Sequence, residues 1–384
     1  MQSNQAFAFI DTHLERTLER TIQVMDINSH SLNRDGVRKV QDIFGEFLSD
    51  LGLKVELRAG GQFGDHLIAG NDFSQDGILL VGHADTAHVE DTPPRRTFRD
   101  GDRIVGPGGY DMKAGVMTFL LALQALKETS VLSDLPLRIL IIGDEEVGMQ
   151  ESFDLHAEAA ANCSRGLVFE SGRPDNMLVL TRKGIAIGAA SARGQKAHSG
   201  NEFWEGANAI LRLSETAVKL AQLSSRERNV TVNIGTFSGG TSPTIVPDEA
   251  KMRFDVRFAS QREFEEVWKE VEAIARQSER PGTHVDISKV LMLPPMELIP
   301  GMDELASSYI SIFKELGQES SINGQIIGGA SSASILTASG LPTIDALGPF
   351  GEGAHTDSEW FSAESFRIKC KTFALWLQRF GTPN

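Results

Sequence analysis

The sequence predicts an α/β protein with a mostly parallel sheet, helices on both of its faces, and a smaller α+β domain inserted into it. Short apolar runs at 77–82, 137–142 and 166–169 alternate with helical patterns, which is typical of strands buried in a parallel sheet. Near Thr181 the pattern changes to strands in which apolar and polar residues alternate. This change indicates a second domain with one solvated sheet face.

The larger domain begins with a predicted amphipathic helix. Its apolar residues lie on one side, namely Phe7, Ile10, Leu14, Leu18 and Ile22. A further helix is expected after Asp111, where apolar residues recur at helical spacing: Val116, Phe119, Leu120, Leu123 and Leu126. The sequence contains neither a signal-peptide pattern nor an apolar run long enough to span a bilayer, so we expect a cytoplasmic protein without membrane contact.

The inserted domain follows the order β-α-β-β-α-β, the split ferredoxin-like arrangement. Its predicted strands are 184–192, 230–237, 251–258 and 284–292, and its predicted helices are 204–222 and 261–276. The chain then returns to helix and strand until its end. We therefore expect the inserted domain to cover 181–292 and the larger domain to be discontinuous, covering 1–180 and 293–384.

Composition limits the class of protein. The chain has 384 residues, enough for two domains, and 23% of them are charged, as in ordinary globular proteins. Its net charge of −15 argues against a nucleic-acid partner, because binding phosphates requires a basic surface. The two cysteines, Cys163 and Cys370, are too few for a zinc–thiolate site and make a disulfide framework improbable.

Five potential metal ligands follow apolar runs or glycine-bounded loops: His83, Asp111, Glu146, Glu170 and His355. Open parallel sheets bind their ligands outside the carboxyl ends of the strands. Two further carboxylates, Asp85 and Glu145, stand beside these residues in the sequence. Together they predict a site at this edge of the sheet.

Each motif also has a simpler explanation. His83 and Asp85 could form a surface hydrogen-bonded pair, Asp111 could cap the following helix, and the acidic run at 144–146 could be an exposed turn. Residues two apart in a strand point the same way, so Asp85 could instead accept the second ring N–H of a metal-bound His83. Counted together, two histidines and three carboxylates suit zinc, and less selectively cobalt or manganese.

The neighbouring acids Glu145 and Glu146 can perform different tasks, because adjacent residues in an extended segment point to opposite sides. One can bind a metal while the other takes a proton from water. We assign the second task to Glu145, as general base and later general acid.

The order of HAD, GGYDMKAG, GDEEVG, FESG, KAHSG and GAHTD resembles the M20 metallopeptidases, most of all the glutamate carboxypeptidase (carboxypeptidase G) branch. The resemblance covers nearly the whole chain and implies a zinc-exopeptidase-like catalytic domain with an inserted lid. It implies two zinc ions bridged by Asp111. One ion would be completed by His83 and Glu170, and the other by Glu146 and His355.

In the inserted domain the resemblance implies three further functional residues. His198 is similar to a histidine that stabilises the oxyanion, often from the partner subunit. Arg257 is similar to an arginine that binds the substrate carboxylate, a task suited to a planar guanidinium. Lys183 is a further candidate for substrate binding. The simpler explanations are a surface-loop histidine and a salt bridge within a strand.

We expect a hydrolase that cleaves an amide bond in a small peptide, releasing a C-terminal amino acid such as glutamate. An N-acyl-amino-acid deacylase would use the same machinery, and a non-catalytic metal-binding or dimerising scaffold is the alternative from another class. We also expect a homodimer formed through the lid. Thr244 and the pair Ser331–Ser332 depart from the pattern of many relatives near the expected substrate pocket, which leaves the substrate side chain open.

Overall fold

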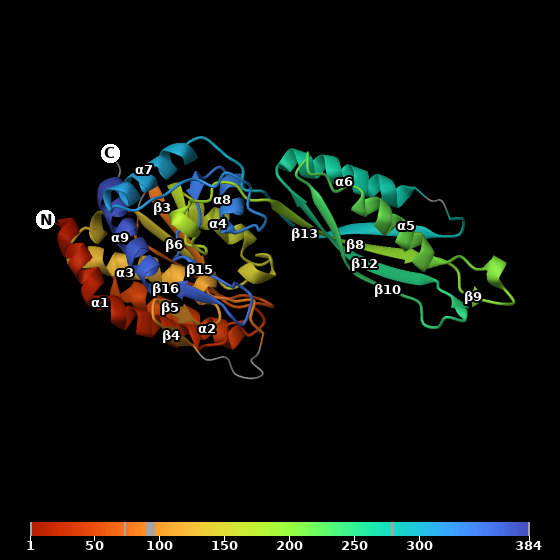
Figure 1. The fold of residues 1–384 in the computed structure, drawn as a ribbon, viewed down its shortest axis with the longest axis horizontal. Coiled ribbons are helices and arrows are strands. Elements are labelled where there is room, and N and C mark those ends of the chain that lie inside the picture. The colour runs from red at the N-terminus through yellow and green to blue at the C-terminus, as the bar shows by residue number, and fades with distance from the viewer. Residues whose placement is uncertain (1, 73, 90–96, 278–279, 383–384) are drawn as a thin grey trace. The chain divides into compact units, whose positions relative to one another are not determined.

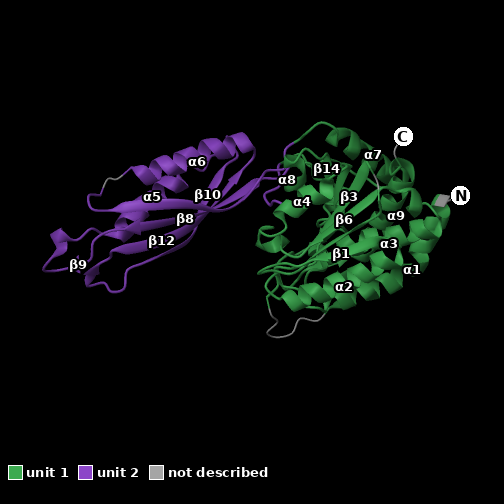
Figure 2. Ribbon diagram, turned by 180° about the vertical axis from the view of Figure 1, so that it is seen from behind, with its two compact units in different colours: residues 1–180, 298–325, 331–384 green, residues 181–297, 326–330 purple. Residues whose placement is uncertain are grey.

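The computed structural model describes residues 2–72, 74–89, 97–277 and 280–382. The chain forms two compact units (Figure 2): unit 1 comprises Met1–Leu180, Leu298–Gln325 and Ser331–Asn384, and unit 2 comprises Thr181–Glu297 and Ile326–Ala330. Within the described ranges, no helix is both long enough and apolar enough to cross a bilayer.

Unit 1 is built on a six-stranded sheet (Figure 1). In spatial order its strands are β1 (Lys54–Arg58), β2 (His66–Gly70), β6 (Leu137–Ile142), β3 (Gly77–His83), β7 (Cys163–Val168) and β14 (Thr343–Ile344). Strand β3 runs parallel to β6 and β7, and β14 runs parallel to β7, whereas β2 runs antiparallel to both of its neighbours, β1 and β6. Every residue of β3 is buried, as its apolar sequence predicts.

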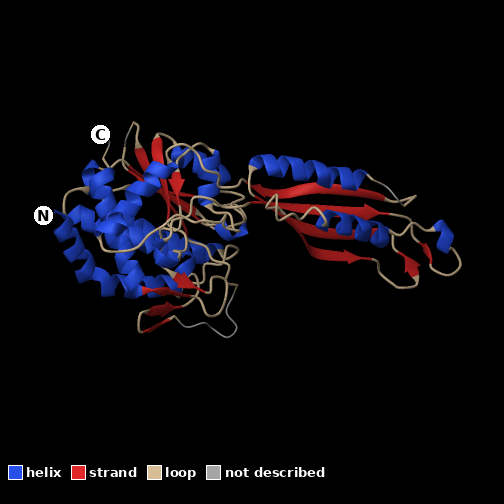
Figure 3. Cartoon of the chain, turned by 45° about the horizontal axis from the view of Figure 1, so that its top comes forward, coloured by secondary structure: helices blue, strands red, loops and turns tan. Residues whose placement is uncertain are grey.

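Helices cover both faces of this sheet, which confirms the predicted fold class (Figures 1 and 3). One group packs together on one face: α1 (Gln2–Met25), α3 (Ala114–Glu128) and α9 (Ala363–Phe380). Helices α4 (Phe153–Ala160) and α8 (Ser332–Ala338) contact each other on the opposite face. The remaining helical segments of unit 1 are α2 (Arg34–Asp50), α7 (Met302–Glu315) and the short turns Gly109–Lys113, Leu132–Asp134, Glu145–Val147 and Pro174–Asn176.

A second, small sheet in unit 1 connects distant parts of the chain. Its order is β15 (Gly351–Glu352), β16 (Trp360–Ser362), β5 (Arg103–Val105) and β4 (Phe98–Asp100). Strand β16 pairs antiparallel with β5, so the hairpin loop containing His355 is brought to the segment that leads to Asp111. Strands of two or three residues are too short to show a periodic pattern, and the sequence did not predict this sheet.

Unit 2 has the predicted β-α-β-β-α-β order. Its antiparallel sheet contains β10 (Thr231–Gly239), β12 (Glu249–Phe258), β8 (Gly184–Arg193) and β13 (His284–Leu293), in that spatial order. Helices α5 (Ala209–Ala221) and α6 (Gln261–Arg276) pack on the sheet around a core that includes Leu213, Phe254 and Val267. A short pair, β9 (Ala197–His198) with β11 (Ile245–Val246), extends beyond the sheet.

The predicted helix at 204–222 begins later than expected. Phe203–Glu205 form a separate turn, and α5 starts at Ala209. Ala207 bonds back to Gln195 through both backbone groups, so it cannot enter a helix. The Asn208 side chain then accepts the backbone N–H of Leu211 and caps α5.

Candidate metal centre

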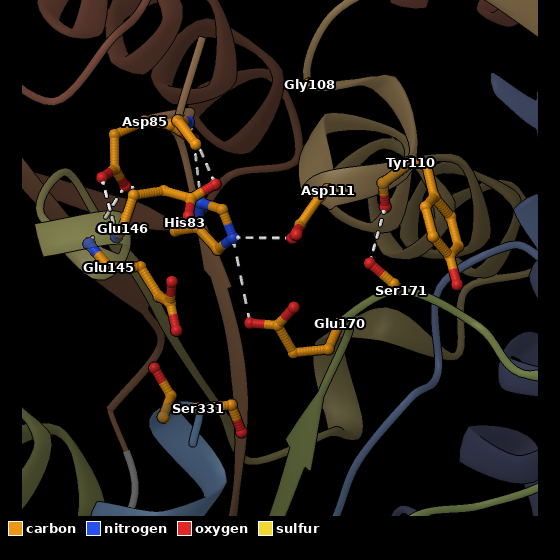
Figure 4. Close-up of polar contacts among 12 residues, drawn as sticks. His83, Asp85, Gly108, Tyr110, Asp111, Glu145, Glu146, Glu170, Ser171 and Ser331 are labelled. Atoms are coloured by element: carbon orange, nitrogen blue, oxygen red, sulfur yellow. Dashed lines mark hydrogen bonds and ion pairs between the residues drawn. The ribbon is translucent and has the colours of Figure 1, made fainter. Parts of the chain in front are cut away.

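The carboxyl ends of three adjacent strands carry most of the candidate residues. His83 is the last residue of β3, Glu145 and Glu146 follow β6, and Glu170 follows β7. Because these strands are parallel neighbours, their ends meet at one edge of the sheet. Figure 4 shows the resulting cluster, in which His83 lies between Asp111 and the Glu145–Glu146 turn.

Asp85 orients the site in a way that differs from the expectation. The nearest acceptor for His83 Nδ1 is the backbone oxygen of Asp85, at 2.9 Å, while the carboxylate Oδ1 lies 3.4 Å away. The buried carboxylate instead accepts the backbone N–H groups of Glu145 (3.2 Å) and Glu146 (3.1 Å). One residue therefore fixes both the histidine ring and the acidic turn.

Asp111 faces two different imidazoles. Its Oδ1 lies 3.4 Å from His83 Nε2, and its Oδ2 lies 3.3 Å from His355 Nε2. A carboxylate whose two oxygens point to separate histidines has the arrangement needed to bridge two cations. The alternative role of Asp111 as a helix cap is not observed, since α3 begins after Lys113 without a side-chain cap.

Each histidine also has its own glutamate. Glu170 Oε1 lies 3.8 Å from His83 Nε2, and Glu146 Oε2 lies 3.1 Å from His355 Nε2. The ligand atoms of His83, Asp111 and Glu146 all lie within 4.8 Å of one another. These contacts pair His83 with Glu170 and His355 with Glu146, and Asp111 contacts both histidines.

The donor set fits a divalent cation. Nε2 of His83 is buried and makes no hydrogen bond to any residue in the described part of the chain, although it lies among carboxylates. Contacts with Asp111 and then Glu146 raise the pKa of His355 to about 11. Burial alone would lower the pKa of His83, but Asp111 and Asp85 hold it well above its usual value. Both imidazoles thus lie where positive charge is strongly favoured.

In the described part of the chain, the contacts of His83 and His355 with Asp111, Glu146 and Glu170 do not involve the carboxylate of Glu145. Burial, followed by the charge of Glu170, raises the pKa of the Glu145 carboxyl well above its usual value. Figure 4 shows its carboxylate directed toward Glu170 and away from Asp85. A carboxylate with a high proton affinity that faces the ligand cluster is suited to accept and return a proton.

The remaining candidates belong to unit 2. His198 in β9 is exposed, and its Nδ1 accepts the backbone N–H groups of Gly200 and Asn201, both at 3.1 Å. The neutral ring therefore carries its proton on Nε2, where it can be donated. Thr244 lies beside this loop, since its backbone oxygen accepts the N–H of Ser199 at 3.1 Å.

Arg257 and Lys183 lie together in unit 2. The Nε of Arg257 donates to Asp255 at 2.9 Å, and its Nη1 donates to the Gly328 oxygen at 3.1 Å. Burial, and then the neighbouring charge of Arg257, lowers the pKa of Lys183. The salt bridge proposed as the simpler explanation for Arg257 is present, and it also holds the guanidinium in one orientation.

Some residues that organise the site were not predicted. Ser31, in the loop between α1 and α2, is buried and donates its hydroxyl to Asp85 Oδ2 at 2.7 Å. A single serine in a loop forms no motif, so no sequence signal identified it. The departures Ser331 and Ser332 make internal bonds, to Asp345 Oδ2 at 2.7 Å and to His156 Nε2 at 2.9 Å respectively.

Comparisons with known proteins agree with this geometry. Residues 180–283 match the peptidase dimerisation domain of the M20 family. Carboxypeptidase G2 of Pseudomonas sp. (strain RS-16) is 28% identical over 348 residues, covering 89% of this chain and 83% of that protein. Acetylornithine deacetylase of Aliivibrio salmonicida is 26% identical over 257 residues, covering 62% and 66%. The structure of an M20 family metallo-carboxypeptidase from Sulfolobus solfataricus superimposes with a TM-score of 0.75 at 17% identity, covering 94% of this chain and 98% of that one.

The fold and the ligand cluster define a metal-dependent hydrolase of the α/β class. The chain is a homologue of carboxypeptidase G2, and its residues 180–283 match the M20 peptidase dimerisation domain. The non-catalytic alternatives lose their support, because the similar proteins named above are hydrolases.

Proposed function

We propose that this protein is a di-zinc carboxypeptidase that releases a C-terminal amino acid, such as glutamate, from a small peptide. The observation that supports this most is the placement of Asp111 between His83 and His355, each of which has its own glutamate. This arrangement supports two half-sites of three ligands each, His83 with Glu170 and His355 with Glu146, which share Asp111. Zinc suits these ligands, and cobalt or manganese could replace it.

In this proposal Glu145 transfers the proton and Asp85 keeps Glu145 in position. Divalent cations at such a site polarise a carbonyl and acidify water. Glu145 takes the proton of the attacking water and later delivers it to the leaving amine, which its raised proton affinity favours. Asp85 keeps the Glu145–Glu146 turn in place through its bonds to both backbone N–H groups.

Arg257 and Lys183 would select the substrate. Asp255 and the Gly328 oxygen fix the guanidinium, so less side-chain entropy is lost when it binds a carboxylate. The ammonium group of Lys183, near Arg257, adds a second positive charge. Two positive charges favour a substrate that carries more than one carboxylate, as glutamate does. Recognition of a free C-terminal carboxylate is what separates a carboxypeptidase from an endopeptidase.

A hydrolysis screen tests the proposal. The zinc-loaded protein is expected to release free glutamate from N-acylated and dipeptide substrates ending in glutamate, and to be inactive after chelation. Preferential release of acetate or succinate from acylated amino acids would instead favour the deacylase, which similarity to acetylornithine deacetylase keeps as the second candidate. No hydrolysis of either substrate group by a metal-loaded sample would contradict the proposal.

His198 and Arg257 of one chain are too far apart within unit 2 to serve the same substrate. Arg257 pairs with Ile185 near the start of β8, whereas His198 lies beyond Arg193 at its other end. Ile185 and Arg193 are eight residues apart along β8, which corresponds to roughly 25 Å. If both act on one small substrate, His198 must come from a second copy of the chain, and the match to a dimerisation domain supports this homodimer.

Mixing two inactive variants tests this shared site. His198→Ala and Glu145→Gln are each expected to lose most activity, but a mixed dimer contains one site with Glu145 from one copy and His198 from the other. Activity should therefore return after the subunits are exchanged, toward about one quarter of the wild-type level if exchange is random. A mixture that stays inactive, despite proven exchange, would show that His198 acts within its own chain.

A further inference from the structure

Glu359 is a buried carboxylate beside the metal centre that neither the motifs nor the proposed chemistry uses. Its exposed fraction is 1%, and it lies four residues after His355. Oε1 accepts the backbone N–H groups of Tyr110 (2.9 Å) and Asp111 (3.0 Å). Oε2 accepts the backbone N–H of Gly108 at 2.9 Å and also contacts Nε2 of His88. Both oxygens are therefore occupied by N–H donors.

The backbone of Glu359 joins the same two segments. Its carbonyl oxygen accepts the N–H of Gly106 at 3.0 Å, and its N–H donates to the Thr356 oxygen at 3.3 Å within the His355 loop. The next residue, Trp360, pairs with Val105 in the small sheet. Glu359 thus connects the loop that carries His355 to the loop that carries Asp111.

The Asp111 loop needs such support because the short turn Gly109–Lys113 is not a regular helix at Asp111. Gly108 adopts a left-handed φ of 66°, and Asp111 has a non-helical φ of −121° and ψ of 92°. A side chain at position 108 would collide with Thr86, since an added Cβ would lie 2.2 Å from its Cγ2. Hydrogen bonds to an ionised carboxylate are stronger than neutral ones, so three of them to one loop can hold it in place.

We propose that Glu359 is a positioning residue that sets the location of Asp111, and through its own loop that of His355, for cation binding. It acts through these two residues and does not touch the cations. This inference rests on the proposed function, in which Asp111 and His355 are ligands. Replacing a residue that orients a metal ligand typically weakens metal binding by about 10–100-fold.

Glutamine at position 359 gives a sharp test because it has nearly the same shape. An amide has only one acceptor oxygen, so either the Tyr110–Asp111 pair or the Gly108–His88 pair would face an NH₂ group. The matched control is Glu151→Gln. Glu151 likewise accepts the backbone N–H groups of one loop, those of Gly61, Gln62 and Phe63, but this loop carries no proposed ligand.

The experiment measures zinc affinity by chelator competition, kcat and KM at saturating zinc, and amide hydrogen exchange of residues 106–112 in the zinc-free protein. Glu359→Gln is expected to bind zinc about 10–100-fold more weakly, to lower kcat more than it raises KM, and to exchange faster at 106–112. Glu151→Gln should match the wild type in all three.

Several results would overturn the inference. Zinc affinity of Glu359→Gln within about twofold of the wild type would do so, as would an equal loss in Glu151→Gln. If Glu359→Gln does not fold, His88→Asn removes only one of the four donors and should weaken zinc binding in the same direction by about threefold; no change would refute the role. If the wild type itself binds no zinc, the proposed function fails, and unchanged hydrogen exchange at 106–112 would separately refute the positioning.

Discussion

Replacing Glu145 with glutamine is expected to lower kcat by about 10²–10⁴-fold while leaving the metal content unchanged. The amide keeps the shape of the side chain but cannot take a proton. Burial and the charge of Glu170 raise the proton affinity of the Glu145 carboxyl, which is the property that a proton-transfer group needs. None of the close contacts that bring His83, Asp111, Glu146, Glu170 and His355 together involves the Glu145 carboxylate.

The measurement combines steady-state kinetics with metal analysis of the same purified sample. Glu352→Gln is the control, because Glu352 is an exposed glutamate of unit 1 in the hairpin that carries His355. Its kcat should equal that of the wild type. A Glu145→Gln protein that keeps kcat within about tenfold of the wild type would remove Glu145 from the chemistry, and one that loses its metal would make it a ligand.

The fold could be predicted largely because its strands have unambiguous patterns. The apolar runs within β3 and β6 (ILLV and ILII) are continuous, and β8 and β12 alternate along their full length. The start of α5 was predicted five residues too early, at position 204 instead of Ala209. The backbone pairing of Ala207 with Gln195 decides the structure there, and this pairing leaves no periodic pattern in the sequence.

The candidate ligands could be predicted because few residue types bind divalent metal ions, and histidine, aspartate and glutamate are among them. His83, Glu146 and Glu170 converge because they follow strands that are parallel neighbours, and contacts with Asp111 and His355 complete the cluster. Their roles as metal ligands stay a prediction until an ion is measured. The cytoplasmic location and the identity of the metal also stay predictions.

The supporting residues could not be predicted, since their roles depend on contacts between distant segments. Ser31 lies 54 residues from Asp85, and Glu359 lies 248 residues from Asp111. The carboxylate of Asp85 was expected to accept the ring N–H of His83. In the structure the backbone oxygen of Asp85 lies at this position and the carboxylate binds the acidic turn, a difference that depends on the direction of one side chain. Such directions follow from packing and leave no pattern in the sequence.

Replacing Asp111 with asparagine is expected to have the largest effect on metal binding, because this one substitution changes the ligand that both half-sites share. Asparagine keeps one acceptor oxygen but is neutral, and its NH₂ group would face either His83 or His355. We expect the zinc content to fall from two ions to one or none per chain, and kcat to fall by at least about 10³-fold, since cation stabilisation of the reacting carbonyl contributes several kcal/mol.

The comparison with Glu170→Gln separates a bridging ligand from an ordinary one. Glu170 contacts His83, whereas Asp111 and Glu146 contact His355, so loss of Glu170 should weaken one ion and leave the other with nearly wild-type affinity. Isothermal titration of both zinc-free variants would show one intact tight site in Glu170→Gln and none in Asp111→Asn. If Asp111→Asn retained one site of wild-type affinity, Asp111 would belong to a single ion, and the two half-sites that its oxygens define would not share a bridge.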